Sequence, residues 1–301
     1  MSRRSKAVAD GVRLAFAIRG GVLTKNARVV TIKQFVNWCW DKGKPILQVR
    51  STSGHHVAGF ALYMLERKLD PRTIQTKLGH VRQILRAAGR NGLANDPRLG
   101  NVALGVGNVP RKGTNQPISP EALDRVLTCA CKRSPELHAG VRLSRALGLR
   151  ANEIVMCGPS LARWKRDLEA GYMAYVTRGT KGGKHRFVLP CDRAEALAAV
   201  IHALGVKGRR KDLFKKPTAK QARKLYANEW TRHLSPASGE GSTPHSLRYA
   251  YAQELRAHLL ALGFSETEVD SIVGLNLGHG DSRGRYMHLV YGQHPLLGRA
   301  G

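Results

Sequence analysis

Apolar residues recur at helical spacing through the first hundred positions, which predicts amphipathic helices. Stripes of this kind run through residues 29–39, 57–65 and 74–85. Gly43 is suited to ending the first helix, because glycine readily takes the left-handed conformation that follows a helix. Asp70 followed by Pro71 is typical of a helix N-terminus and predicts where the third helix begins. The pattern therefore predicts an all-helical domain over residues 26–103.

Two segments interrupt the periodic pattern and divide the chain. Residues 1–25 are basic and contain glycine, so we expect a loose basic arm there. Residues 104–118 mix glycine, proline and polar residues without a period, which predicts a linker. The remainder, residues 119–301, is then a second domain. A chain of 301 residues is long enough to form two separate hydrophobic cores.

The second domain carries both helical and β patterns. Ser119, Thr243 and Ser265 each precede a helical run and are suited to capping it. Residues 172–177 are rich in strand-forming side chains, and residues 187–189 follow them across a glycine-containing turn, which predicts a short hairpin. We therefore expect a mainly α protein with a small β-sheet, an α+β fold class.

The balance of charge narrows the range of partners. The chain has 50 Lys and Arg against 21 Asp and Glu, a formal net charge of +29. Such an excess repels itself in a compact fold, and a polyanion such as nucleic acid relieves that repulsion. A ribosomal or other RNA-binding protein shows the same balance, so charge alone does not indicate an enzyme. Because we find neither a membrane-length apolar run nor a signal sequence, we expect a cytoplasmic protein with no membrane partner.

Other polar groups in the sequence point to no metal or cofactor. The five cysteines are scattered and lack the spacing of a metal site, so we expect them to be reduced and mostly in the core. Residues 207–224 carry nine Lys or Arg and one acid. This segment predicts either a solvated basic face or a surface that follows a phosphate backbone.

Several residues of the second domain are suited to holding a phosphodiester. Cleavage of this anionic group without a metal requires fixed cations on its nonbridging oxygens, and the planar fork of arginine can bind two oxygens at once. His245 and Arg248 are three residues apart, so they face one side of a helix and can serve one phosphate. His279 would add a third donor. Arg150 would add another guanidinium group, which Glu153 could hold in place.

The sequence also offers candidates for the acid that protonates the leaving oxygen and for the nucleophile. Lys181 and Lys184 lie in a glycine-containing turn and could protonate the leaving 5′ oxygen. Tyr286 and Tyr291 follow His279, and a tyrosine nucleophile would form a covalent phosphotyrosyl intermediate. Each of these segments is ordinary on its own, and Leu-Gly-His also occurs at residues 78–80 inside a predicted helix. Their order and spacing within one basic domain favour a single site.

The ordered set resembles that of the tyrosine recombinase, or phage integrase, family over about residues 25–295. The resemblance implies a helical core-binding domain at residues 26–103 and a mostly helical catalytic domain at residues 119–301, which clamp duplex DNA. The residues that match the catalytic positions of the family are Arg150, Lys181 with Lys184 as the alternative, His245, Arg248 and His279, with Glu153 in support.

The position of the nucleophile departs from the family pattern. The family usually places its tyrosine nine residues after the second histidine, and this chain has His288 there. Tyr286 lies seven residues after His279, and Tyr291 lies twelve after it. A loop tolerates an insertion more easily than a stretched segment tolerates a deletion. We therefore expect Tyr291 to attack, with Tyr286 as the alternative.

The resemblance implies a site-specific DNA recombinase that integrates or excises a mobile element through a 3′-phosphotyrosyl intermediate. It implies double-stranded DNA as the partner, a monomer in solution that forms a homotetramer on DNA, and accessory DNA-bending proteins at the nucleoid. The alternatives are a catalytically silent DNA-binding protein on the same fold and a type IB topoisomerase-like enzyme. An RNA-binding protein would leave the ordered set unexplained.

Overall fold

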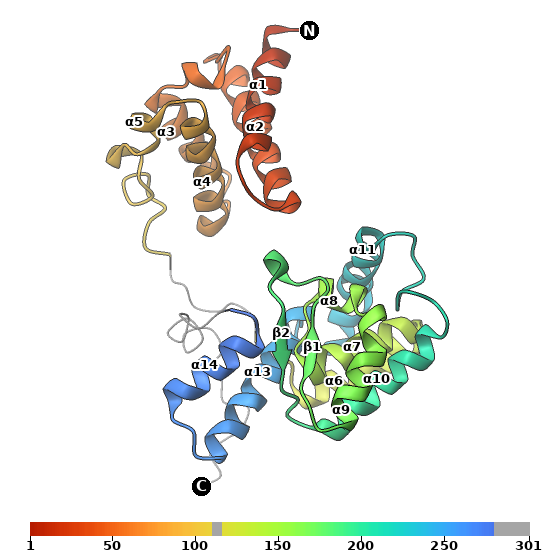
Figure 1. Cartoon of the computed structure of the whole chain (residues 1–301). Coiled ribbons are helices and arrows are strands. Elements are labelled where there is room, and N and C mark those ends of the chain that lie inside the picture. The colour runs from red at the N-terminus through yellow and green to blue at the C-terminus, as the bar shows by residue number, and fades with distance from the viewer. Residues whose placement is uncertain (110–115, 280–301) are drawn as a thin grey trace. The chain divides into compact units, whose positions relative to one another are not determined.

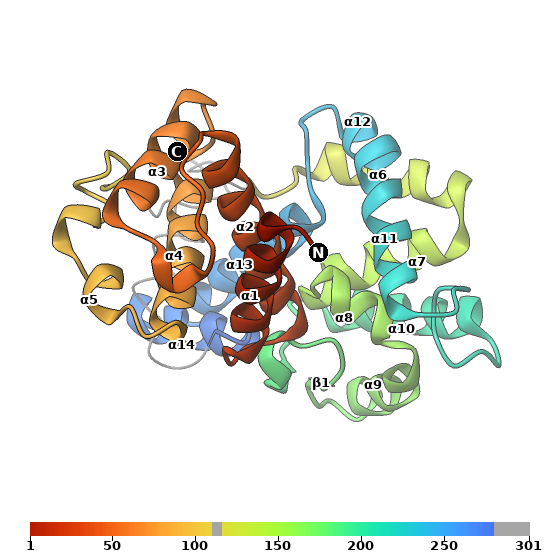
Figure 2. The ribbon, with the colours of Figure 1, turned by 90° about the horizontal axis from the view of Figure 1, so that it is seen from above.

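The chain folds as two compact units with separate hydrophobic cores. The computed structural model describes residues 1–109 and 116–279. Clustering of its contacts gives a first unit, Met1–Pro110, and a second unit, Arg111–Gly301 (Figure 1 and Figure 2). Each unit has its own cluster of buried apolar side chains. The two units are therefore described separately.

The described part of the first unit is helical. Its helices are α1 (Arg3–Ala17), α2 (Val22–Asp41), α3 (Gly54–Glu66), α4 (Pro71–Ala87) and α5 (Asn91–Ala94), with 3₁₀ turns at Val49–Ser51 and Pro97–Leu99. The three predicted apolar stripes lie in α2, α3 and α4 and supply the core of the unit. Asp70 caps α4 by accepting a hydrogen bond from the Thr73 N–H at 3.1 Å. Gly43 takes a φ of +68° after the end of α2, as expected.

The predicted loose arm at residues 1–25 is wrong. Helix α1 occupies most of this segment and packs along α2 (Figure 1). Ala7, Leu14 and Ala15 are buried between the two helices. At Gly11 an added Cβ would lie 2.6 Å from the Ile32 side chain, so the helices approach closely there. The apolar face was missed because small residues form much of it and charged residues lie between them.

The second unit consists of helices and a two-stranded sheet, with helix α7 (Pro135–Leu147) at its centre. Its helices are α6 (Pro120–Arg133), α7 (Pro135–Leu147), α8 (Ala151–Met156), α9 (Leu161–Glu169), α10 (Arg193–Lys207), α11 (Ala219–Glu229), α12 (Ser235–Ser238), α13 (Pro244–Ala261) and α14 (Glu266–Asn276). A π-helical turn at Trp230–Leu234 joins α11 to α12. Helix α7 packs against α6, α10 and α13, while α14 packs against α13 and the sheet (Figure 1).

The predicted hairpin is present as a two-stranded antiparallel sheet. Strand β1 (Ala174–Val176) pairs with β2 (Arg186–Val188), so that Val176 lies opposite Arg186. Side chains alternate between the two faces of a strand. Tyr175 and Phe187 therefore stack on the outer face, with ring centroids 4.6 Å apart. Arg186 and Val188 face inward. The expected mainly α fold with a small sheet is confirmed.

The expected helix starts in the second unit are also confirmed. Ser119 accepts a hydrogen bond from the Ala122 N–H, and Ser265 forms a capping box with Glu268. Thr243 forms the corresponding cap at the start of α13. The five cysteines are free. Among residues 1–109 and 116–279, no helix is both long enough and apolar enough to cross a membrane.

Candidate active site

The turn between α7 and α8 places Arg150 at the start of a helix. Gly148 ends α7 in the left-handed conformation, with φ +56°. No residue with a side chain fits at position 148 without a shift, because an added Cβ would lie 2.3 Å from the ring of Tyr251. Arg150 is the N-cap residue of α8, and its backbone N–H donates to Glu153 Oε2 at 2.8 Å. Its Nη1 donates to Glu153 Oε1 at 2.9 Å, so Glu153 holds the guanidinium group as expected.

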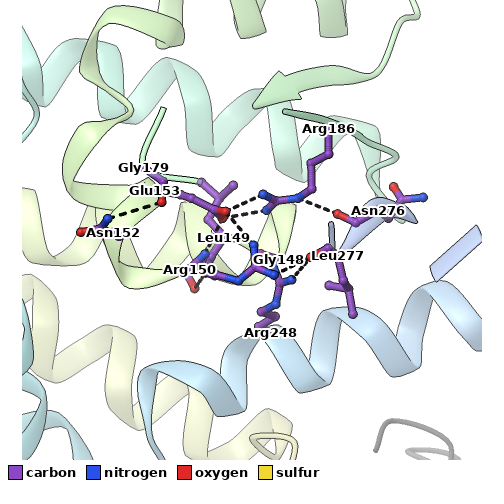
Figure 3. A network of polar contacts seen from close by, with 11 residues as sticks. Gly148, Leu149, Arg150, Asn152, Glu153, Gly179, Arg186, Arg248, Asn276 and Leu277 are labelled. Atoms are coloured by element: carbon purple, nitrogen blue, oxygen red, sulfur yellow. Dashed lines mark hydrogen bonds and ion pairs between the residues drawn. The ribbon is translucent and has the colours of Figure 1, made fainter. Parts of the chain in front are cut away.

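Arg248 reaches the same place from the first turns of α13. Its side chain is fully buried, and its two terminal nitrogens donate to the carbonyl oxygens of Gly148 and Leu277. Arg150 Nη2 donates to the same Leu277 oxygen at 2.7 Å. Figure 3 shows the two guanidinium groups meeting beside Leu277. The two arginines of the predicted set are thus brought together by one main-chain carbonyl at the end of α14.

His245 lies three residues before Arg248 on α13, near enough to Arg248 and Arg150 for their charges to act on it. Burial, together with the charges of Arg248 and Arg150, lowers the pKa of His245 from 6.5 to about 4. The imidazole is therefore neutral near pH 7, and it can donate one hydrogen bond to an oxygen while remaining uncharged. Its ring packs edge-on against Tyr249, with centroids 5.2 Å apart.

The end of α14 brings the two residues before His279 to the arginine cluster, which comprises Arg150 and Arg248. Gly278 has a φ of +66°, and the His279 N–H donates to the Gly274 carbonyl at 2.9 Å, which closes the helix. A Cβ added at Gly278 would lie 3.8 Å from Arg150 Nη1. Residue 279 therefore follows directly on a segment that touches Arg150.

The two candidate lysines lie on the exposed loop of the hairpin. Lys181 begins a short 3₁₀ turn, Lys181–Gly183, and Lys184 follows it. Both lysines are exposed. Lys184 also lines an open cavity of about 470 Å³ together with Arg186 and Gly278, and the latter touches the arginine cluster. Lys184 therefore borders the same cavity as Gly278, and no contact of Lys181 with this cavity is among its described lining.

Sequence reasoning missed Arg186, a third arginine of the cluster. Its side chain is 3% exposed, and its Nη1 and Nη2 donate to the two oxygens of Glu153 at 2.5 and 2.7 Å (Figure 3). Burial raises the pKa of Glu153, but the hydrogen bonds and charge of Arg186, with the charges of Arg248 and Arg150, outweigh it and lower the pKa. Glu153 is therefore ionised at neutral pH. The available signal was the position of Arg186 two residues before Val188, on the inward side of a strand.

The remaining predictions have different outcomes. Tyr286 and Tyr291 lie outside the described residues. The other Leu-Gly-His sequence, at residues 78–80, lies in α4 of the first unit, where His80 Nδ1 is 3.0 Å from Thr31 Oγ1. It is thus a feature of that unit's helix packing.

The basic segment 207–224 runs from the end of α10 into α11, and most of its basic side chains are exposed.

Two family models match the chain over most of its length. One, described as "Integrase", matches residues 105–254. The other, described as "Phage integrase, N-terminal", matches residues 1–94. No curated protein sequence matches the chain significantly. The two models meet near the boundary between the two compact units.

Solved structures of integrases share the fold at low sequence identity. A lambda integrase(75-356) dimer bound to a COC′ core site is 16% identical, with a TM-score of 0.64, and 93% of each chain is covered. A lambda integrase tetramer bound to a Holliday junction is 14% identical, with a TM-score of 0.63, covering 93% of this chain and 76% of that one. The Tn1549 transposon integrase in complex with transposon right end DNA is 14% identical, with a TM-score of 0.60, covering 96% of this chain and 94% of that one.

Proposed function

Because the chain belongs to the tyrosine recombinase family of phage integrases, we propose that it cleaves and rejoins DNA at specific sites through a 3′-phosphotyrosyl intermediate. The proposed substrate is double-stranded DNA at the ends of a mobile element, which the enzyme integrates or excises. Its net charge of +29 supports a polyanionic partner. We place its activity in the cytoplasm, at the nucleoid.

The observation that carries this proposal is the convergence of Arg150, Arg248 and His245. Three guanidinium groups, counting that of Arg186, face the single carboxylate of Glu153, so the cluster has an excess of two positive charges. An anion bound at its surface would balance this excess. Arg150 is the arginine of the pair that reaches the surface, with its side chain 19% exposed. Fixed donors of this kind stabilise charge that develops in a transition state.

Each site residue has a role in the proposed reaction. Arg150 and Arg248 hold the phosphate, while His245 and His279 donate hydrogen bonds to its nonbridging oxygens. The hydroxyl group of Tyr291, or of Tyr286 as the alternative, loses its proton to solvent as its oxygen attacks phosphorus, and the bond to the 5′ oxygen breaks. Lys181, or Lys184 as the alternative, gives the leaving oxygen its proton. The phosphotyrosyl bond retains the energy of the broken bond, so the reverse attack by a 5′ hydroxyl rejoins the strands.

The proposed assembly is a monomer in solution that forms a homotetramer on two DNA sites. The lambda integrase relative was captured as a tetramer bound to a Holliday junction, which supports this expectation. Accessory DNA-bending proteins would assist in bringing the sites together. The unusual spacing of the tyrosines favours one other function, that of a DNA-binding relative that has lost cleavage.

Covalent trapping tests the proposal directly. Nicked duplexes that carry the element's own ends are incubated in EDTA with the wild-type chain, Tyr291→Phe and Tyr286→Phe. We expect a protein–DNA band that resists denaturation with the wild type and with Tyr286→Phe, and its loss with Tyr291→Phe. Loss with Tyr286→Phe alone would identify Tyr286 as the nucleophile. DNA binding without a wild-type band would favour the silent DNA-binding protein. A wild-type band without strand exchange between two duplexes would favour a topoisomerase-like enzyme.

A further inference from the structure

Arg186 makes contacts that suit a structural bridge more than a ligand-binding group. All three of its guanidinium nitrogens donate to acceptors within the protein. Two donate to Glu153, and Nε donates to the Asn276 carbonyl at 2.7 Å. The side chain is 3% exposed. These bonds tie the guanidinium group of Arg186 to the protein on two sides, so its contacts are those of a bridge between Glu153 and Asn276.

Through Glu153, Arg186 reaches Arg150. Glu153 is fully buried, and each of its oxygens accepts one hydrogen bond from Arg186 and one from Arg150. The bonds from Arg150 come from both its backbone N–H and its guanidinium group. The position of this one carboxylate therefore sets both the start of α8 and the direction of the Arg150 side chain.

At its other end, Arg186 holds the last residue of α14. Asn276 accepts from Arg186 through its carbonyl, and its Oδ1 accepts from the Leu189 N–H at 2.6 Å. The next carbonyl along the chain, that of Leu277, accepts from Arg150 and Arg248. Gly278 lies against the stem of Arg186, where an added Cβ would be 3.1 Å from Arg186 Cδ. Arg186 thus joins β2 to the segment that leads to His279.

The lysine-bearing loop is fixed at both of its ends. On one side, Gly179 lies against the backbone of Asn152, and Asn152 Nδ2 is 3.4 Å from the Gly179 carbonyl. On the other side, Arg186 is held by Glu153 and Asn276 (Figure 3). Between these points Gly182 and Gly183 both have positive φ. The contacts at both ends fix where the loop begins and ends relative to Glu153, and the two glycines supply the left-handed conformations that its turn needs.

We infer that Arg186 is a positioning residue, which acts through Glu153 on Arg150 and through Asn276 on the end of α14. This role rests on the proposed function. It requires the planar fork of arginine, because a single ammonium group cannot reach both oxygens of Glu153 and the Asn276 carbonyl together. The positioning role of Arg186 therefore differs from the effect of its positive charge alone, because lysine would also provide that charge.

The test is single-turnover formation of the covalent adduct on the nicked duplex at saturating protein. Arg186→Lys and Arg186→Gln are compared with the wild type, and DNA affinity is measured in parallel. The matched control is Arg142→Gln, which removes a guanidinium group that also pairs with a carboxylate, that of Glu195 at 2.8 Å. We expect the rate constant of both Arg186 variants to fall about tenfold to 100-fold. We expect unchanged amplitude and DNA affinity, and a control close to the wild type.

Two results would overturn the role of Arg186. A wild-type rate in Arg186→Lys would show that charge alone suffices. A reduced amplitude at an unchanged rate constant would show that Arg186 only stabilises the fold. If Arg186→Gln gives little soluble protein, Arg186→Lys keeps the charge and decides the question.

A double-mutant cycle with Glu153→Gln tests the path of the effect. Because Arg186 acts partly through Glu153, we expect the double variant to be faster than the product of the two single effects predicts, whereas effects that multiply fully would refute the route through Glu153. Absence of a wild-type adduct would refute the proposed function and this role with it. A wild-type adduct with an unaffected Arg186→Lys variant would refute the role alone.

Discussion

Replacing Glu153 by Gln should destabilise the second unit strongly. Glu153 is fully buried and accepts four hydrogen bonds, from the guanidinium groups of Arg150 and Arg186 and from the backbone of Arg150. Gln keeps the shape but removes the charge that balances these groups. Removing one partner of a buried ion pair costs about 3–5 kcal/mol. In a unit of this size, 1 kcal/mol shifts Tm by about 2–4 °C, so we expect Tm to fall by about 6–20 °C.

Calorimetry of the full chain at pH 7 measures the effect, with Glu195→Gln as the control. Glu195 pairs with Arg142 but is 50% exposed, and a surface pair of this kind contributes about 0–1 kcal/mol. Equal Tm values for Glu153→Gln and Glu195→Gln would refute the reasoning. The pH dependence provides a second check. The pKa of Glu153 is lowered by folding, so its contribution is present above the unfolded value of 4.5 and is lost as the pH falls through the lower folded value. The gap between wild type and Glu153→Gln should therefore close in acid.

Two further predictions concern the backbone turn and the buried histidine. Gly148→Ala should destabilise the unit by at least about 1–2 kcal/mol in urea unfolding, because φ is +56° and the added methyl would collide with Tyr251. Gly205→Ala, in an open position on α10, should instead stabilise it by about 0.5–1 kcal/mol, and equal responses would contradict the argument. The lowered pKa of His245 predicts stability that is present above pH 6.5 and is lost as the pH falls towards about 4, since the unfolded chain binds the proton more readily. His245→Gln should reduce that slope between pH 4 and 6.5 by the share that His245 contributes, and an unchanged slope would show that other groups cause it.

The sequence predicts those parts of the molecule whose signal is local. Helix periods and caps, such as those at Asp70 and Ser265, depend on residues within a few positions of one another, and the structure has them where expected. Arg150 and Arg248 were singled out because guanidinium groups suit an anion, and Glu153 because it lies three residues after Arg150, where its carboxylate can hold that guanidinium group. Helix α1 was missed because alanine and glycine contribute little apolar signal, although they allow close packing against α2.

The parts that were missed depend on long-range contacts. Nothing near Arg186 in the sequence shows that a carboxylate 33 residues earlier will neutralise it inside the core. A basic residue beside an exposed loop is usually solvated. Asn276 likewise gains its role from Arg186 and Leu189, which only the fold brings next to it. The catalytic roles of the arginines and histidines, and the choice of lysine and of tyrosine, all stay predictions.

The acceptors that hold the arginines are largely main-chain atoms. Gly148, Asn276 and Leu277 offer carbonyl oxygens, and every residue type carries one. A substitution at Leu277 that preserves packing would leave its acceptor in place, whereas a substitution at Arg150 or Arg248 removes a donor. Within one hydrogen bond, the residue that offers a main-chain carbonyl thus tolerates substitution better than the arginine that donates to it. Over evolutionary time Arg150 and Arg248 should stay constant while Leu277 varies among residues that preserve packing, so a comparison of sequences by residue identity would reveal only one partner of these two contacts.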